Sequence, residues 1–177
     1  MNGQAAASAS AGGILVYDPS NPNSLNQLTW LDRSGKALGN IGEFQRQGMV
    51  VLAPDGKTAA TLQNWRTTAT PVTMSLYDLQ RGGETRLTAP PLTPSTPVWS
   101  PASDLIAFGS GNSLYVKDAS GGSPEERLLE SRNEVMPSGW SQDGRYLVLL
   151  QVQPDAPAPA LSVITNWERA ALARTPD

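Results

Sequence analysis

The sequence predicts an all-β fold, built as an array of about four four-stranded antiparallel units. A tight turn between strand-forming segments recurs along the chain, beginning at Ser10, Ala53, Ser100 and Ser141. The spacings between these turns are 43, 47 and 41 residues, which is the period of a four-stranded unit and is too long for an isolated hairpin. Glycine, proline, serine and threonine separate the strands throughout, so the pattern leaves no room for a helical domain.

The first three units are expected to contain four strands each, because short apolar or alternating runs lie between turn residues. The first unit, residues 5–42, has a weak strand at about 5–10 and stronger ones at 14–17, 27–32 and 37–41. The second unit, residues 43–89, has strands at 49–52, 58–62, 72–79 and 84–88. The third unit, residues 90–131, has strands at 97–99, 105–109, 113–117 and 126–129. In all three units the third strand ends in an aspartate followed shortly by glycine, at Asp32, Asp78 and Asp118.

The fourth unit, residues 132–166, is predicted to lack its last strand. It has strands at 146–152 and 161–165, joined by a proline-rich connector at 154–159. Residues 167–177 are rich in helix formers and are expected to form a short terminal helix and tail, with Asn166 as its cap.

Antiparallel units with this period are typical of a β-propeller, in which each unit is one blade. The predicted fold is therefore a single all-β, propeller-like domain of about four blades, with an incomplete last blade and a short C-terminal helix. Two kinds of residue fit this fold without a further role. Trp30, Trp99 and Trp140 lie in or just before strands, which favours core packing over ligand stacking. Asp55 and Asp143 precede glycines in hairpin turns, and no D-x-D-x-D-G calcium loop is present, which favours turn chemistry over cation binding.

Several segments together resemble a known family. The segments are 28–36, 53–57, 97–101, 139–146 and the ending 161–167. They are similar to the TolB-like, WD-repeat-like propellers found C-terminal to many bacterial serine/threonine protein kinases. Members of that family usually have about six or more blades, so the resemblance implies a shortened or partial propeller. The chain has neither a Gly-rich loop followed by a strand lysine nor a His-Arg-Asp loop, so the resemblance implies the accessory propeller without the kinase activity.

Composition argues against several functional classes. The chain has no histidine and no cysteine, which removes Ser-His-Asp and Cys-His catalysis and the commonest zinc ligands. We therefore predict no catalytic residue, no metal site and no cofactor. Charged residues make up 16% of the chain and the net charge is −3, which argues against nucleic acid as a partner.

Membrane targeting is not predicted for this chain. The N-terminus lacks the basic region of a signal peptide, and no apolar run approaches the ~20 residues of a membrane span. Localisation then depends on what the chain is attached to. It would be periplasmic or extracytoplasmic beside a membrane-spanning kinase, and cytoplasmic otherwise.

One end of the blades is the predicted binding surface. In an antiparallel meander, the loops between second and third strands emerge at the same end as the connections between blades. This end gathers, among other segments, residues 44–46 and 64–66, and the candidate binding residues on it are Arg46, Trp65, Arg66, Arg132 and Glu134. Aromatic and arginine side chains are enriched at binding hot spots, so we expect a protein or peptide partner here. The alternative is an ordinary solvated rim with the tryptophan folded onto its own blade.

These observations favour a non-catalytic protein-interaction or sensor propeller, as an accessory domain of a bacterial signalling protein such as a receptor-like serine/threonine kinase. The alternatives are the substrate-gating propeller of a prolyl-oligopeptidase-like hydrolase and a TolB-like envelope assembly protein. A short array also leaves an unpaired strand edge and uncovered apolar faces on its end blades. We expect it to stay open and to associate through those blades, or to require flanking sequence.

Overall fold

A computed structural model describes residues 6–9, 15–18, 25–64, 70–151 and 160–165. Every regular element in these ranges is a β-strand, so the predicted all-β class is confirmed. The chain divides into two compact units, Met1–Pro94 and Ser95–Asp177, and each is described by itself. The helix predicted at 167–177 and its cap Asn166 lie outside the described residues.

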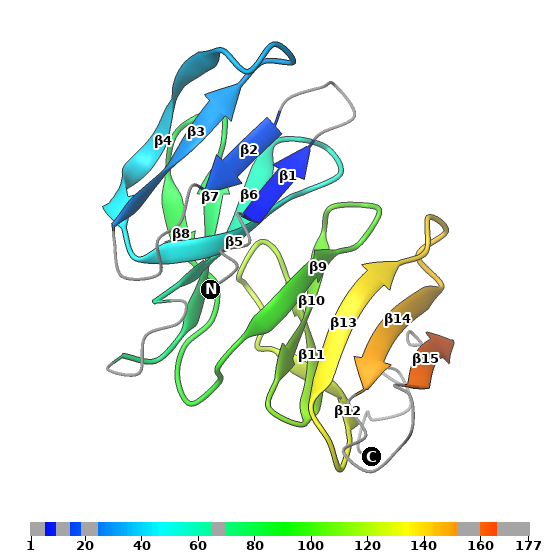
Figure 1. Ribbon diagram of the computed structural model, residues 1–177. Helices are drawn as coiled ribbons and strands as arrows, with labels where there is room; N and C mark the ends of the chain where they lie inside the picture. The colour runs from blue at the N-terminus through cyan, green and yellow to red at the C-terminus, as the bar shows by residue number, and fades with distance from the viewer. Residues whose placement is uncertain (1–5, 10–14, 19–24, 65–69, 152–159, 166–177) are drawn as a thin grey trace. The chain divides into compact units, whose positions relative to one another are not determined.

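The first unit contains two four-stranded antiparallel sheets (Figure 1). The first sheet has the order β1-β2-β3-β4, with strands Ala6–Ala9, Leu15–Asp18, Asn26–Leu31 and Ala37–Gln45. The second has the order β5-β6-β7-β8, with strands Gln47–Leu52, Thr58–Gln63, Thr73–Asp78 and Glu84–Arg86. Both are meanders, because each strand pairs with its neighbour in sequence. The weak N-terminal strand is confirmed as β1, which pairs with β2 of its own sheet.

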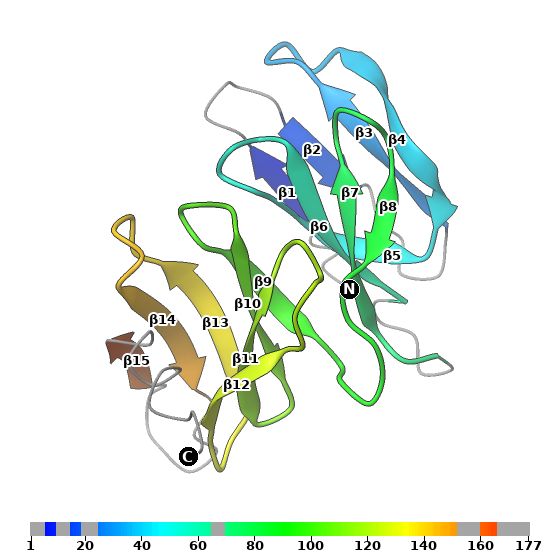
Figure 2. The same ribbon diagram turned by 180° about the vertical axis from the view of Figure 1, so that it is seen from behind.

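The second unit contains one four-stranded and one three-stranded sheet (Figure 2). The third sheet has strands β9 to β12, at Ser95–Trp99, Leu105–Ser110, Ser113–Asp118 and Glu126–Glu130. The fourth has strands β13 to β15, at Val135–Trp140, Tyr146–Gln151 and Ala160–Thr165. Within the described part of the chain, β15 pairs only with β14. The predicted incomplete last blade agrees with this sheet.

Each unit has an apolar core between its two sheets. In the first unit, Leu28 and Ile41 of the first sheet pack with residues of the second, of which Tyr77 is the largest. Trp30 packs against the margin of this cluster. Because successive side chains of a strand point to opposite faces of its sheet, one face of each sheet supplies this core.

The core of the second unit lies between the third and fourth sheets. Ala107 and Leu114 of the third sheet pack with valine and leucine side chains of the fourth, and Trp140 packs against their margin. Trp99 is 6% exposed. The prediction that Trp30, Trp99 and Trp140 contribute to cores is therefore confirmed, although Trp140 has a second environment described below.

A bulge recurs in the first strand of the second, third and fourth sheets, and sequence analysis does not predict it. The pairing register shifts between Gly48 and Val51 in β5, and opposite Ala107 to Gly109 in the pairing of β9 with β10. A third shift lies between Pro137 and Gly139 in β13. A bulge adds one residue and bends its strand, so the same local bend is built into three successive sheets.

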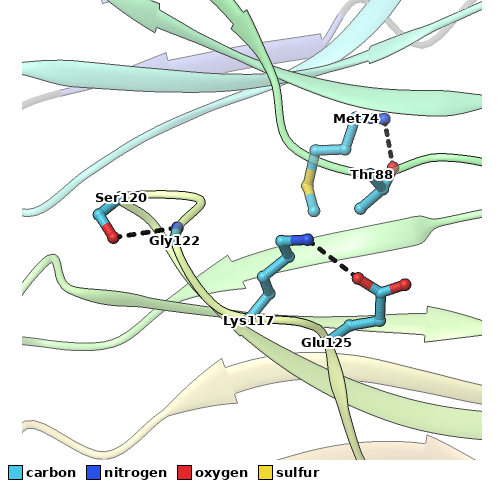
Figure 3. A network of polar contacts seen from close by, with 6 residues as sticks. All are labelled: Met74, Thr88, Lys117, Ser120, Gly122 and Glu125. Atoms are coloured by element: carbon cyan, nitrogen blue, oxygen red, sulfur yellow. Dashed lines mark hydrogen bonds and ion pairs between the residues drawn. The ribbon is translucent and has the colours of Figure 1, made fainter.

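The aspartates that end the third strands hold the turns that follow. In each turn the carboxylate Oδ1 accepts the backbone N–H two residues later: Asp32 from Ser34 at 2.8 Å, Asp78 from Gln80 at 2.9 Å, and Asp118 from Ser120 at 2.7 Å. In the last of these turns the Ser120 hydroxyl also accepts the N–H of Gly122 at 3.3 Å (Figure 3). The recurring aspartate therefore has a local structural function.

These turns predict an acid-sensitive contribution to stability. Hydrogen bonds from the backbone amides of Arg81 and Gln80 lower the pKa of Asp78 below 3.8. Because the folded-state pKa is depressed, the stabilisation is present above the unfolded-state pKa and is lost as pH falls through the folded-state value. We expect Asp78→Asn, which keeps an acceptor oxygen but does not titrate, to melt below wild type at neutral pH. The gap should close toward about pH 2 in circular dichroism melts, and a gap that stays constant with pH would contradict this account.

Candidate functional site

The two ends of each sheet carry different connections. The end that we call the turn end carries the tight β3–β4, β5–β6, β7–β8, β9–β10, β11–β12 and β13–β14 hairpins. The opposite end, called the loop end, carries the β10–β11 turn, the end of β6, and the β4–β5 and β12–β13 connections between successive sheets. The predicted binding residues belong to the loop ends.

In the first unit, Arg46 is exposed and connects β4 to β5. Its backbone carbonyl accepts the N–H of Asn64, which follows β6, at 2.6 Å. The sheet-to-sheet connection and the loop after β6 are therefore joined directly, as the meander argument predicts. Trp65 and Arg66 lie outside the described residues, so their place at this end stays a prediction.

In the second unit, Arg132 and Glu134 are exposed in the connection from β12 to β13. Asn112, in the turn between β10 and β11, donates its side-chain amide to the carbonyl of Ser131 at 2.8 Å. The N–H of Ser131 returns a bond of 2.9 Å to the carbonyl of Asn112. This structure brings Arg132 and Glu134 to one connection, and their role in binding stays a prediction.

Phe44 belongs to the segment 44–46 that sequence reasoning places at the loop end of the first unit, although only Arg46 of that segment was chosen as a candidate binding residue. Phe44 is 62% exposed near the end of β4. Leu25, which is 57% exposed, directly precedes Asn26, and Asn26 pairs with Gln45. Two exposed apolar side chains therefore lie next to a paired position of the same two strands, and one of them, Phe44, is close in sequence to Arg46. The strand order predicted the position of Phe44, but a lone aromatic residue at a strand end gives no periodic signal of how far its side chain is exposed.

A polar network joins the two sheets of the first unit. The side-chain amides of Gln45 and Gln63 donate to the two carboxylate oxygens of Glu84, at 2.8 and 3.2 Å. The Gln63 amide also lies 3.4 Å from the hydroxyl of Tyr77. Burial raises the pKa of Tyr77, and the negative charge of Glu84 raises it further. The phenol therefore stays neutral, and the network holds the end of β4 against the second sheet.

The second unit has a cleft at its turn end, between the β9–β10 and β13–β14 hairpins. Its volume is about 440 Å³. The lining residues are Ser100, Pro101, Ala102, Asp104 and Leu105 from the first hairpin and Trp140, Gln142, Asp143 and Gly144 from the second. The cleft therefore combines an aromatic ring and apolar groups with two carboxylates.

Both carboxylates of the cleft are held by serines of their own hairpins. Ser100 donates its hydroxyl to Oδ1 of Asp104 at 2.6 Å, and Ser141 donates to Oδ1 of Asp143 at 2.6 Å. The Ser141 hydroxyl and the backbone N–H of Arg145 lower the pKa of Asp143. The side chains are therefore fixed in position, and Asp143 remains ionised down to acid pH.

Several carboxylates outside the cleft support turns or form ion pairs. Asp55 Oδ1 accepts the N–H of Lys57 at 2.9 Å, so the turn interpretation of Asp55 and Asp143 is confirmed. Lys117 and Glu125 form an ion pair of 2.9 Å in the second unit (Figure 3), and this bond lowers the pKa of Glu125. Among the residues that the structure describes, no three His, Cys, Asp or Glu side chains are grouped so that they could hold a metal ion. The same ranges contain no helix of the length and apolar character needed to cross a membrane.

Comparison with known proteins assigns the fold. Residues 53–156 match the family described as the dipeptidyl peptidase IV (DPP IV) N-terminal region. No curated protein sequence matches the chain. Two solved structures similar to it are TolB from Acinetobacter baumannii, with TM-score 0.67 and 14% identity, and the tricorn protease, with TM-score 0.69 and 15% identity. A third is hydrazine synthase from Kuenenia stuttgartiensis, with TM-score 0.67 and 20% identity.

The similarity extends over nearly all of this chain but only part of each relative. The chain is covered over 91%, 93% and 90% of its length by TolB, tricorn protease and hydrazine synthase, and it spans 40%, 16% and 45% of those chains. At these identities the likeness establishes the fold alone. The fold is a TolB-like β-propeller array, and the last sheet of three strands agrees with an incomplete propeller.

Proposed function

Given that this chain belongs to the family of the dipeptidyl peptidase IV N-terminal region, we propose that it is a non-catalytic propeller domain that binds a protein or peptide partner. The observation that carries the proposal is the exposed Phe44 close to Arg46 at the loop end of the first unit. An exposed aromatic near an arginine is the residue combination typical of binding hot spots. The Glu84 network holds this strand end in place, which limits the entropy lost on binding.

The carboxylates of the described residues support the non-catalytic assignment. General acid-base catalysis requires a titratable group that points at a substrate with a pKa near the working pH. Asp32, Asp78, Asp118 and Asp143 instead accept hydrogen bonds from their own turns, and these bonds lower the pKa of each. These carboxylates stay ionised and hold their turns. The sequence contains no histidine or cysteine that could act as the acid or base instead.

We propose a role as accessory domain of a bacterial signalling protein such as a receptor-like serine/threonine kinase. A second role, the substrate-gating propeller of a hydrolase, is favoured by the family match to a peptidase N-terminal region. The DNA on either side of the coding segment distinguishes them. A kinase domain encoded upstream supports the first role, and an α/β-hydrolase domain downstream supports the second. A TolB-like envelope role would be accompanied by neither. Association through the end blades also stays a prediction.

Partner binding at the loop end can be tested with a random peptide library displayed on phage and selected on the purified chain. We expect the selected peptides to bind about tenfold or more weakly to Phe44→Ala and to Arg46→Ala, because truncating a hot-spot residue removes at least that much affinity. Both residues are exposed, so the thermal midpoints should match wild type.

A matched control lies on the same strand. Leu38 is 59% exposed on β4 but follows the β3–β4 turn, at the turn end. Leu38→Ala removes a similar exposed apolar group and should leave peptide binding unchanged. Peptides that bind all three variants equally would overturn the assignment of the site. A large fall in the thermal midpoint of Phe44→Ala would show that the ring is part of the packing.

A further inference from the structure

We propose that the cleft at the turn end of the second unit binds a basic side chain of a partner polypeptide, with its guanidinium or ammonium group between Asp104 and Asp143. This goes beyond the proposed function, because the site lies in the other unit from Phe44 and specifies the chemistry of its ligand. The cleft has a volume of about 440 Å³. This lies within the range of clefts that hold small groups.

The charge of the cleft favours a cation. Asp104 and Asp143 are the charged residues among those that line it, so the lining has two carboxylates and no basic side chain. Arg145 is outside the lining: its guanidinium lies 5.6 Å from the centroid of the Tyr146 ring, and its positive charge contributes to lowering the pKa of Asp143. A concave surface lined by charge of one sign concentrates ions of the opposite sign.

The hairpins of neighbouring repeats show how the second carboxylate arises. In the β5–β6 and β13–β14 hairpins, the residue just before the second strand is basic, Lys57 and Arg145. At the matching position of the β9–β10 hairpin the residue is Asp104. Ala102 stands where the sibling hairpins have Asp55 and Asp143, and Asp104 accepts the Ser100 hydroxyl in place of that missing carboxylate. The exchange reverses the charge at the mouth of the cleft.

The two carboxylates are preorganised to accept hydrogen bonds. Each uses Oδ1 to accept a serine hydroxyl at 2.6 Å, from Ser100 for Asp104 and from Ser141 for Asp143. The Oδ2 atoms are then available to the guanidinium or ammonium donors of a ligand. Because the side chains are already fixed, less rotamer freedom is lost on binding, and charge-assisted bonds are the stronger class of hydrogen bond.

Trp140 supplies the apolar wall of the cleft. Its indole Nε1–H donates to the carbonyl of Gly144 at 2.9 Å, which fixes the ring across its own hairpin. Leu105 and Pro101 continue the apolar lining on the facing hairpin. Lysine and arginine have apolar stems below their charged ends, and tryptophan is the best aromatic partner of a cation. A basic side chain therefore fits both parts of the lining.

The test is an NMR titration of the full chain, with the Trp140 indole N–H signal as reporter, assigned by its loss in Trp140→Phe. The probes are blocked Gly-Arg-Gly and Gly-Lys-Gly peptides, a Gly-norleucine-Gly peptide without the charge, and the free amine agmatine. We expect the two basic peptides to shift the signal with Kd values of about 1 mM at low salt, and added salt to weaken them. The norleucine peptide should leave the signal unmoved.

Variants locate the site. Asp104→Lys restores the charge of the sibling hairpins at an exposed position, and we expect it to abolish the shift by the basic peptides while amide signals stay dispersed. Asp55→Asn, in the equivalent hairpin of the first unit, should bind as wild type does. Equal shifts by the norleucine peptide, or unchanged binding in Asp104→Lys, would overturn the proposal. If agmatine binds and neither basic peptide does, the proposal that the ligand is a polypeptide is wrong. Phe44→Ala should not affect this titration, so it succeeds or fails independently of the loop-end site.

Discussion

Gly109→Ala is expected to destabilise the second unit by about 3 kcal/mol, at the upper end of the cost of overpacking a core. A Cβ at this position of β10 would overlap the backbone carbonyl of Val135, on β13 of the facing sheet, and would lie 2.9 Å from the Ser95 hydroxyl oxygen. A backbone carbonyl in a strand cannot rotate away as a side chain does. The two sheets would have to separate, and contacts across their shared core would be lost.

Gly139 is the matched control for this substitution. It lies on β13 in the same unit, and a Cβ added there has nothing within 4 Å. We expect Gly139→Ala to change the free energy of unfolding by less than about 1 kcal/mol, as surface substitutions usually do. Urea unfolding followed by tryptophan fluorescence measures both variants. Equal effects of the two substitutions would mean that close approach of β10 and β13 does not limit stability.

Gly109 also shows where prediction from the sequence stops. Its strand was predictable, because the short apolar run at 105–108 and the turn after it are local signals. The requirement for glycine was not, because it depends on a carbonyl 26 residues away that only sheet packing brings near. The bulges of β5, β9 and β13 could not be predicted from the sequence for the same reason, because they arise from the pairing of one strand with another. Local turn chemistry at Asp32, Asp78 and Asp118 was visible because each carboxylate bonds within its own turn.

Of the two candidate sites, the position of the loop-end site could be predicted from the sequence and the cleft could not. The expected strand order predicted that Arg46, Arg132 and Glu134 lie at the loop ends of the sheets, because in an antiparallel meander the strand order alone decides which connections share an end. Their role in binding needs experiment. The cleft was not predictable, because the sequence does not show that the hairpins of Asp104 and Trp140 lie side by side. Repeat spacing indicated a core position for Trp140, and the structure adds that the same residue lines the cleft.

Tyr77→Ala is the second substitution with a large expected effect, a loss of about 3–5 kcal/mol, the range for truncating a buried aromatic side chain. Tyr77 is 0% exposed and belongs to the core between the first and second sheets. Its ring lies directly under β4, since a Cβ at Gly42 would be 2.6 Å from Tyr77 Cε1. Truncation would leave a cavity between the sheets that the fixed strands cannot fill. Thermal melts measure this loss. Leu38→Ala, at an exposed position of the same unit, is the control and should melt close to wild type if the loss comes from the buried ring and not from any substitution by alanine.

Tyr77→Phe separates the hydroxyl from the ring and predicts a distinct dependence on pH. Burial raises the pKa of Tyr77 above its ordinary 10.0, and the carboxylate of Glu84 adds to the rise. The folded state therefore holds the neutral phenol more firmly than the unfolded chain does. The resulting stability is complete below about pH 10 and is lost as pH rises toward the folded-state pKa, because the unfolded chain ionises first. At pH 8 the phenylalanine variant should lose about 1 kcal/mol, the worth of one hydrogen bond. Urea unfolding from about pH 8 to about pH 11 should then show wild-type stability falling toward that of the variant, whereas parallel curves would place the alkaline sensitivity elsewhere.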